Sequence, residues 1–158
     1  MNKTKEEYMQ MAIDLAQKNV EEGKGGPFGA VIVKNGEIIA TGANSVTTLN
    51  DPTAHAEVTA IRNACKKLNS FQLDDCEIYS SCEPCPMCLG AIYWARPKAL
   101  YFAADKDDAS NAGFDDSFIY EELELDYSKR SILTQQLKMN SKLKPFEIWD
   151  KSSLKLAY

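Results

Sequence analysis

The sequence predicts an α/β protein in which helices pack on a central sheet. Short apolar runs typical of strands alternate along the chain with amphipathic helical periods, and strand-to-helix crossovers favour parallel neighbouring strands after an initial hairpin. The length of 158 residues, with 44% apolar and 26% charged residues, is typical of one globular domain. We therefore expect residues 1–158 to form a single domain.

The chain begins with a predicted amphipathic helix. Thr4 and Glu7 have the spacing of a capping box, and apolar residues recur at helical intervals until Gly23. A hairpin follows, because the apolar runs at 28–33 and 38–42 flank an Asn-Gly turn. The first run is apolar throughout, so we expect it inside a sheet that is covered on both faces.

Helices and strands alternate through the middle of the chain. A polar loop leads into a predicted helix over 54–68, and a short strand follows at 76–81. The next helix, over 84–96, is stopped by Pro97, and another strand is predicted at 99–104. These elements supply the layers of the expected α/β domain.

The pattern weakens beyond Gly113. Residues 114–123 favour a short helix, and residues 145–158 favour a C-terminal one. Aromatic residues near the end, including Phe146 and Trp149, predict that this tail docks on another surface.

Charge and hydropathy argue against several classes of protein. A net charge of −5 and a pI near 5.0 argue against a nucleic-acid backbone as the main partner, because such binding depends on clustered Lys and Arg. There is no apolar run of a secretory signal and none of the roughly 18 residues that a membrane helix needs, so we expect a cytoplasmic protein with a small-molecule partner. Residues 105–126 hold nine acids and one lysine, whereas the chain from residue 128 carries a local +5, a pattern typical of a solvated surface or a subunit contact.

Three residues have the types and spacing of zinc ligands. His55 is the only histidine, and it lies near the start of a predicted helix, where its side chain can reach an ion beyond the helix end. Cys85 and Cys88, at positions i and i+3, share a helix face, and the positive helix end favours their thiolate forms. One imidazole and two thiolates leave a fourth position for water, which is the arrangement of catalytic zinc. The sequence therefore predicts one Zn²⁺ per subunit with a bound water or hydroxide.

Two other interpretations of the cysteines stay open. With Cys82 as a fourth ligand the site would be closed, and the chain would be a structural-zinc binding module, although Glu57 would then have no role. Alternatively, Cys85 or Cys88 would be a nucleophile with His55 as its base, although one nucleophile has no need of two thiols at chelating spacing.

Glu57 gives the metal site a catalytic interpretation. Side chains lean towards the N-terminus of their helix, so Glu57 points into the space that His55 faces. The order H-x-E followed by P-C-x-x-C is the signature of zinc-dependent nucleobase deaminases, and it occurs here at residues 55–57 and 84–88. In such a site Glu57 would take a proton from the water, deliver it to a ring nitrogen and help to protonate departing ammonia.

Longer stretches resemble the small bacterial guanine deaminases of the cytidine-deaminase-like fold. The similarity rests on GGPFGAVIV, NDPTAHAEVTAIR, LDDC, SCEPCPMCLGAIYWARPKA, AGFDDSFIY and the final tyrosine, and it is dense from Phe28 to Tyr120. The resemblance implies a three-layer α/β/α fold with a central mixed five-stranded sheet. It also implies a homodimer in which C-terminal segments, from about residue 115, are exchanged between subunits. The implied reaction is hydrolysis of guanine at C2 to xanthine and ammonia, a step of purine catabolism. Residues 121–144 match little, so nothing is carried over there.

The resemblance also assigns residues to roles. The zinc ligands and the proton-moving glutamate are those that the motif predicts. Asp116, in GFDDSF, would be the second catalytic acid, which binds guanine and assists its leaving amino group. The other residues that would contact the substrate are Asn44, Phe28, Ala56, Trp94 and Tyr158. From the residues alone, Asp116 is more typical of a helix cap, and Asn44 is equally well explained by a loop turn.

A tRNA adenosine deaminase is the alternative within the same chemistry. That class shares the PTAHAE and EPCxMC core, and the basic C-terminal region is the one feature that favours it. The overall acidity and the GFDDSFIY segment favour guanine instead. Deaminases of pterins or cytosine are further alternatives.

Overall fold

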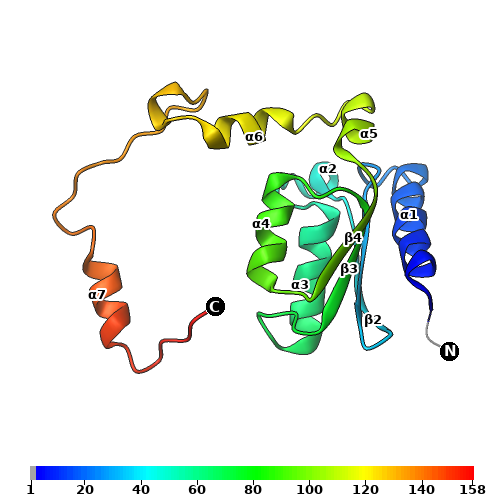
Figure 1. Ribbon diagram of the computed structural model, residues 1–158, viewed down its shortest axis with the longest axis horizontal. Helices are drawn as coiled ribbons and strands as arrows, with labels where there is room; N and C mark the ends of the chain where they lie inside the picture. The colour runs from blue at the N-terminus through cyan, green and yellow to red at the C-terminus, as the bar shows by residue number, and fades with distance from the viewer. Residues whose placement is uncertain (1–2) are drawn as a thin grey trace. The chain divides into compact units, whose positions relative to one another are not determined.

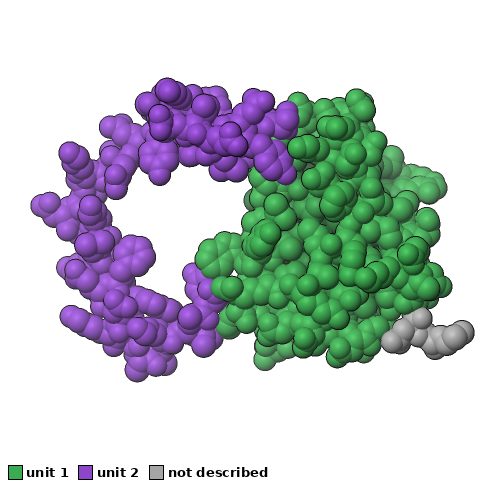
Figure 2. Space-filling view, in the orientation of Figure 1, with its two compact units in different colours: residues 1–116 green, residues 117–158 purple. Residues whose placement is uncertain are grey.

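The structure of the chain is a computed structural model that describes residues 3–158. They divide into two compact units, of which the first ends at Asp116 and the second comprises Ser117–Tyr158 (Figure 2). In the first unit, α1 covers one face of a sheet, and α3 and α4 cover the other (Figure 1). The predicted α/β fold with three layers is confirmed.

Five helices belong to the first unit: α1 (Lys5–Glu21), α2 (Val46–Leu49), α3 (Ala56–Leu68), α4 (Pro86–Ala95) and α5 (Lys106–Asn111). The capping box predicted for α1 is present, because the Thr4 hydroxyl accepts from the Glu7 amide and the Glu7 carboxylate accepts from the Thr4 amide. None of the helices within the described residues is long and apolar enough to cross a membrane.

The central sheet has four strands within residues 3–158, in the order β2-β1-β3-β4. They are β1 (Gly29–Lys34), β2 (Glu37–Ala43), β3 (Cys76–Cys82) and β4 (Ala99–Ala104). The expectation of a five-stranded sheet is therefore wrong for this structure. Apolar runs predict only these four strands, and a helix begins directly after β4. The Asp105 side chain starts that helix by accepting hydrogen bonds from the amides of Asp107 and Asp108.

The sheet is mixed, as predicted, but its strand directions differ in one place from the expectation. β3 and β4 are parallel, whereas β1 pairs with β3 in antiparallel register. The crossover through α3 connects β2 to β3, and β1 lies between these two strands. The connection therefore makes β2 and β3 parallel without making them neighbours.

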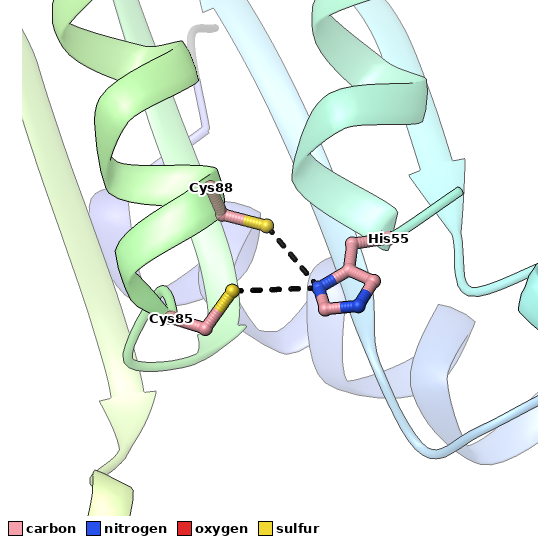
Figure 3. Close-up of side chains that lie close together, drawn as sticks. All are labelled: His55, Cys85 and Cys88. Atoms are coloured by element: carbon pink, nitrogen blue, oxygen red, sulfur yellow. Dashed lines mark hydrogen bonds between the residues drawn. The ribbon is translucent and has the colours of Figure 1, made fainter. Parts of the chain in front are cut away.

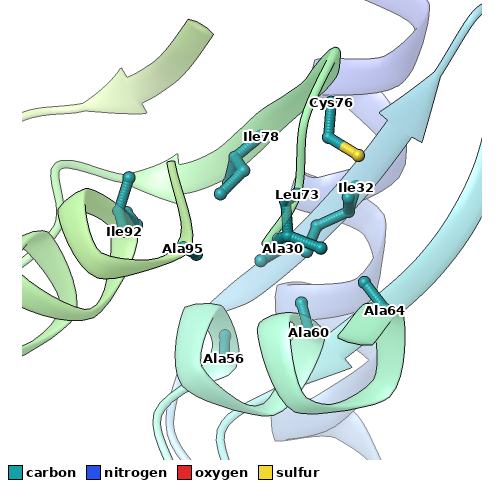
Figure 4. Packing of buried hydrophobic residues seen from close by; sticks show 10 residues of the cluster. All are labelled: Ala30, Ile32, Ala56, Ala60, Ala64, Leu73, Cys76, Ile78, Ile92 and Ala95. Atoms are coloured by element: carbon teal, nitrogen blue, oxygen red, sulfur yellow. The ribbon is translucent and has the colours of Figure 1, made fainter. Parts of the chain in front are cut away.

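The larger of the two apolar cores lies between the sheet and α3 with α4 (Figure 4). Helix α3 faces it with three alanines, Ala56, Ala60 and Ala64, which have almost no exposed surface. Small side chains let the helix lie close to the strands, and the first of them is next to the predicted site residues. The core therefore fixes where the N-terminus of α3 lies.

The second unit contains α6 (Ser117–Glu124), a 3₁₀ turn (Tyr127–Lys129) and α7 (Lys144–Lys151). Both predicted helices of this region are present, but the C-terminal one ends at Lys151 and does not continue to the chain end. No residue of Ser117–Tyr158 is buried. This unit therefore has no apolar core of its own.

Candidate metal centre and active site

The two predicted ligand motifs occupy equivalent places at the starts of two helices. His55 is the N-cap of α3 and Cys85 is the N-cap of α4, and neither side chain caps its own helix by a hydrogen bond. Pro86 occupies the first turn of α4, where its missing N–H costs no helical hydrogen bond. Both cap side chains are thus available for another partner, at helix ends that favour negative charge.

The side chains of His55, Cys85 and Cys88 converge on one point (Figure 3). The Sγ atoms of Cys85 and Cys88 lie 3.5 and 3.4 Å from Nδ1 of His55. All three ligand atoms lie within 4.8 Å of one another, so a single ion can be shared among them. One imidazole nitrogen and two sulfurs are the donors that Zn²⁺ prefers.

The electrostatics of the two thiols also fit a cation. The Cys88 thiol donates towards Cys85, and with His55 it lowers the pKa of Cys85 to about 4 despite burial. The hydrogen bond to Cys85, together with burial, raises the pKa of Cys88. The pair therefore keeps one proton when no positive ion is present. A divalent cation is what allows both sulfurs to be thiolates at neutral pH.

Glu57 lies beside this group in the first turn of α3 and is 6% exposed. Burial raises the pKa of its carboxyl, as expected for an acid removed from water. Its Oε1 atom accepts a hydrogen bond of 3.0 Å from the Ser80 hydroxyl on β3. Burial favours the protonated form of this carboxyl, which suits a group that holds and releases a proton in general acid-base catalysis.

Cys82 does not join the three converging side chains. Its sulfur lies 3.6 Å from the Asp105 carbonyl oxygen, and burial raises the pKa of its thiol to about 11. It is not part of the ligand group found among the described residues. The structure therefore gives no support to a closed four-ligand site.

Asp116, the last residue of the first unit, is half-buried. Burial raises the pKa of its carboxyl, and the negative charge of Cys85 raises it further. The carboxyl is therefore within electrostatic range of the metal ligands, although it is 28 residues further along the chain than Cys88.

The remaining residues that were predicted to contact the substrate differ in burial and in their own contacts. Asn44 is 7% exposed, and its Oδ1 accepts from the amides of Gly26 and Val46 at 3.2 and 3.3 Å. Phe28 is half-buried, and its ring meets that of Phe114 edge-on at 5.0 Å.

Ala56, Trp94 and Tyr158 differ in exposure. The Ala56 side chain is buried in the core, so only its backbone is available to a ligand. Trp94 is 62% exposed on α4, and Tyr158 belongs to the second unit. The first unit thus brings together His55, Cys85, Cys88, Glu57 and Asp116.

Ser80 is a contact residue of this site that the motifs do not indicate. Residues of β3 alternate between the two faces of the sheet. Cys76 and Ile78, which lie on the same face as Ser80, belong to the apolar core. A serine on that face is the signal that sequence reasoning could have used. Its hydroxyl needs a buried partner, and the structure shows that the partner is Glu57.

Comparison with known proteins identifies the class. The family model for the zinc-binding region of cytidine and deoxycytidylate deaminases matches residues 2–104, about two thirds of the chain. The chain belongs to this family. Its membership agrees with the three converging ligands, and the protein is a zinc-binding deaminase.

Particular relatives narrow the class. The chain is 59% identical over 153 residues to the guanine deaminase of Bacillus subtilis, covering 97% of this chain and 98% of the relative. An X-ray structure of guanine deaminase from Bacillus subtilis superimposes with a TM-score of 0.97 at 58% identity, covering 99% of each chain. A tRNA-specific adenosine deaminase of Aquifex aeolicus is 47% identical over 103 residues, which cover 65% of this chain and 68% of that protein. The similarity to the guanine enzyme includes the C-terminal unit.

Proposed function

We propose that the protein hydrolyses guanine at C2 to xanthine and ammonia, as a step of purine catabolism. The observation that carries the proposal is the 59% identity to a guanine deaminase over 97% of the chain. The match continues through the region after residue 116, where the substrate preference of the family is expected to be encoded. A cytoplasmic location stays a prediction from the sequence.

His55, Cys85 and Cys88 would hold the zinc ion. When bound there, zinc supplies Lewis-acid chemistry, which lowers the pKa of a water molecule towards about 7. Two thiolates and one imidazole would provide three ligands, which would leave room for a water molecule as a fourth. His55 must be deprotonated at the nitrogen that binds zinc. The hydrogen bond to Cys85 raises the pKa of His55 and so favours the protonated ring, which opposes zinc binding at low pH.

Glu57 would move the protons of the reaction. Its carboxylate takes a proton from the attacking water, delivers it to a ring nitrogen of guanine and later helps to protonate the departing amino group. The overall reaction adds one water and releases one ammonia, so Glu57 ends in the form in which it began. Asp116 would hold the exocyclic amino group and assist its departure, which its position beside the ligand group supports.

Asn44 would recognise the purine edge through its side-chain nitrogen. Its Oδ1 already accepts two backbone hydrogen bonds, from Gly26 and Val46. These bonds fix the amide orientation and make Nδ2 the group that donates to a ring acceptor. A fixed donor discriminates among bases because its orientation cannot change to suit another edge.

The other contact residues would shape the pocket. Phe28 and Trp94 would stack on the base, and the backbone of Ala56 would contact its edge. Tyr158 would close the pocket as a lid. These four roles are carried by the sequence resemblance.

We further propose that the protein is a homodimer in which the C-terminal segment from about residue 115 is exchanged between subunits. The support is the composition and exposure of Ser117–Tyr158, where no residue is buried and apolar side chains are exposed. Among the largest are Phe118, Leu133, Phe146, Ile148 and Trp149, with exposed fractions of 44–91%. So much apolar surface is costly in water and is normally covered by another polypeptide.

Sedimentation measurements test the dimer. We expect a dimer at micromolar concentration for the wild type and a shift towards monomer for Trp149→Glu. Val20→Glu is a matched control, because Val20 is an apolar residue of the first unit with a similar exposed fraction, 51% against 44%. A wild-type monomer at these concentrations would contradict the proposal.

The function is tested by measuring ammonia release from guanine, adenine, cytosine, their nucleosides and a tRNA anticodon stem-loop. We expect turnover of guanine, with xanthine as the product identified by its ultraviolet spectrum. Turnover of the stem-loop without turnover of guanine would instead establish the tRNA adenosine deaminase, to which the 47% identity over 103 residues points.

A further inference from the structure

Ser80 lies at the centre of the sheet and faces the catalytic side of the molecule. Its strand, β3, is an inner strand, and within it Ser80 pairs with Ala30 of β1 and Phe102 of β4. The residue is 2% exposed. Its row on the strand is otherwise apolar where it meets α3, since Cys76 and Ile78 belong to the core. A hydroxyl at this position is costly unless it has a hydrogen-bond partner.

The partner of the Ser80 hydroxyl is the Glu57 carboxylate, at 3.0 Å from Oγ to Oε1. A carboxylate can only accept, so the serine donates. The two residues come from different layers, one from the sheet and one from the first turn of α3. The contact therefore links the group that moves the proton to an inner strand of the sheet.

We propose that Ser80 is a positioning residue for the deamination: its hydroxyl holds Oε1 of Glu57 and so presents the other carboxylate oxygen, Oε2, to water and substrate. The proposal rests on the proposed function, in which Glu57 carries protons between the attacking water and the base. A carboxylate held at one oxygen cannot turn freely about its last side-chain bond. Glu57 then takes up and delivers the proton at one fixed position, which lowers the entropy cost of reaching the reactive geometry.

The adjacent serine provides a matched control. Ser81 is also buried, at 8% exposed, and its Oγ accepts a hydrogen bond of 3.0 Å from the Gly29 amide. It lies next to Ser80 on the same strand but on the opposite face. Its replacement removes a buried hydroxyl and one hydrogen bond without touching Glu57.

The experiment compares Ser80→Ala, Ser80→Thr and Ser81→Ala with the wild type in kcat and KM for guanine, zinc content and thermal midpoint. We expect Ser80→Ala to keep its zinc and to lose about 30-fold in kcat with KM within about threefold, as for a misplaced catalytic group. Ser80→Thr keeps the hydroxyl and restores most of kcat. Ser81→Ala lowers the thermal midpoint but keeps kcat.

A double-mutant cycle shows whether Ser80 acts through Glu57. Adding Ser80→Ala to Glu57→Gln should lower the remaining rate by less than about twofold, because the group that Ser80 holds no longer carries protons. The proposal is overturned by an unchanged kcat in Ser80→Ala, by an equal loss in Ser81→Ala, or by a full further loss in the double mutant. A wild-type enzyme that does not turn over guanine would instead overturn the proposed function.

Discussion

Gly42 of β2 lies against the backbone of Ala56 in the first turn of α3, with no room for a side chain between them. A Cβ atom at Gly42 would overlap the Ala56 carbonyl oxygen and the Ala60 amide nitrogen. Both obstacles are backbone atoms, which cannot rotate away as a flexible side chain can. This contact sets the distance between the sheet and the helix end that carries His55 and Glu57.

Gly42→Ala is therefore expected to destabilise the protein by about 3 kcal/mol, as overpacking of a filled core does. It should also lower zinc content, because α3 must shift away from its place. Urea unfolding followed by circular dichroism measures the first effect, and metal analysis measures the second. Gly90→Ala is the control: a Cβ there meets nothing within 4 Å, and alanine in a helix favours stability by up to about 1 kcal/mol. Equal midpoints for the two variants would contradict this account of the packing.

Zinc content separates the two kinds of cysteine in the site. Cys88→Ser should lose most of its zinc after dialysis, because Cys88 is one of three converging ligands. Cys82→Ser should keep one zinc per chain, since its sulfur lies against the Asp105 carbonyl and outside that group. Inductively coupled plasma mass spectrometry gives both values. Zinc lost from Cys82→Ser as well as from Cys88→Ser would restore the closed-site interpretation.

Glu57→Gln tests the assignment of the proton-moving group. Glutamine has nearly the same shape but no acid-base function, so we expect zinc to be retained and kcat for guanine to fall by about 10³-fold or more. Measurement of ammonia release at high enzyme concentration can quantify the remaining rate. A loss of less than about tenfold would move the main proton-transfer role to another residue, with Asp116 as the nearest candidate.

Stability should depend on pH through Glu77, on the far side of the sheet from the metal group. The Tyr79 hydroxyl donates to Glu77 at 2.7 Å, and with Lys98 it holds the carboxyl pKa below its ordinary value of 4.5. An acid with a lowered pKa in the folded state adds stability above its unfolded pKa and loses it as pH falls through the folded pKa. The difference in thermal midpoint between wild type and Glu77→Gln should thus be constant well above pH 4.5 and shrink below it.

The control for this pH dependence is Glu37→Gln, on an exposed side chain whose ion pair with Lys67 is at 4.0 Å. Exposed pairs of this kind contribute little. We expect a thermal midpoint close to that of the wild type at every pH. A Glu77 effect that is the same at pH 3 and at pH 7 would show that its hydrogen bonds contribute without its charge.

Much of the fold follows from local patterns in the sequence. The Asn-Gly turn predicts the hairpin because both of its residues need positive φ, and Asn35 and Gly36 have φ of 51° and 81°. β4 has the predicted limits. The direction of β1 relative to β3 could not be predicted. It depends on the order of strands in the sheet, in which β1 lies between β2 and β3, the two strands that the α3 crossover connects. No local pattern encodes that order.

The metal ligands are also visible in the sequence, because chelation imposes a short spacing on Cys85 and Cys88. Residues that are far in sequence from their partners in the site have no such spacing and cannot be recognised in this way. Asp116 looks like a helix cap until the fold brings it near Cys85, and Ser80 has no motif at all. The short helix α2 was likewise not predicted, since only four residues form it.

The single histidine gives this protein a built-in spectroscopic reporter. His55 alone contributes imidazole signals, so a proton NMR spectrum of the unlabelled chain contains one pair of histidine ring protons, free of overlap from other histidines. Its ring nitrogen faces both cysteine sulfurs. Stepwise addition of Zn²⁺ or of a chelator can therefore be followed at a single pair of resonances. The occupancy of the centre then becomes measurable during catalysis without any substitution in the protein.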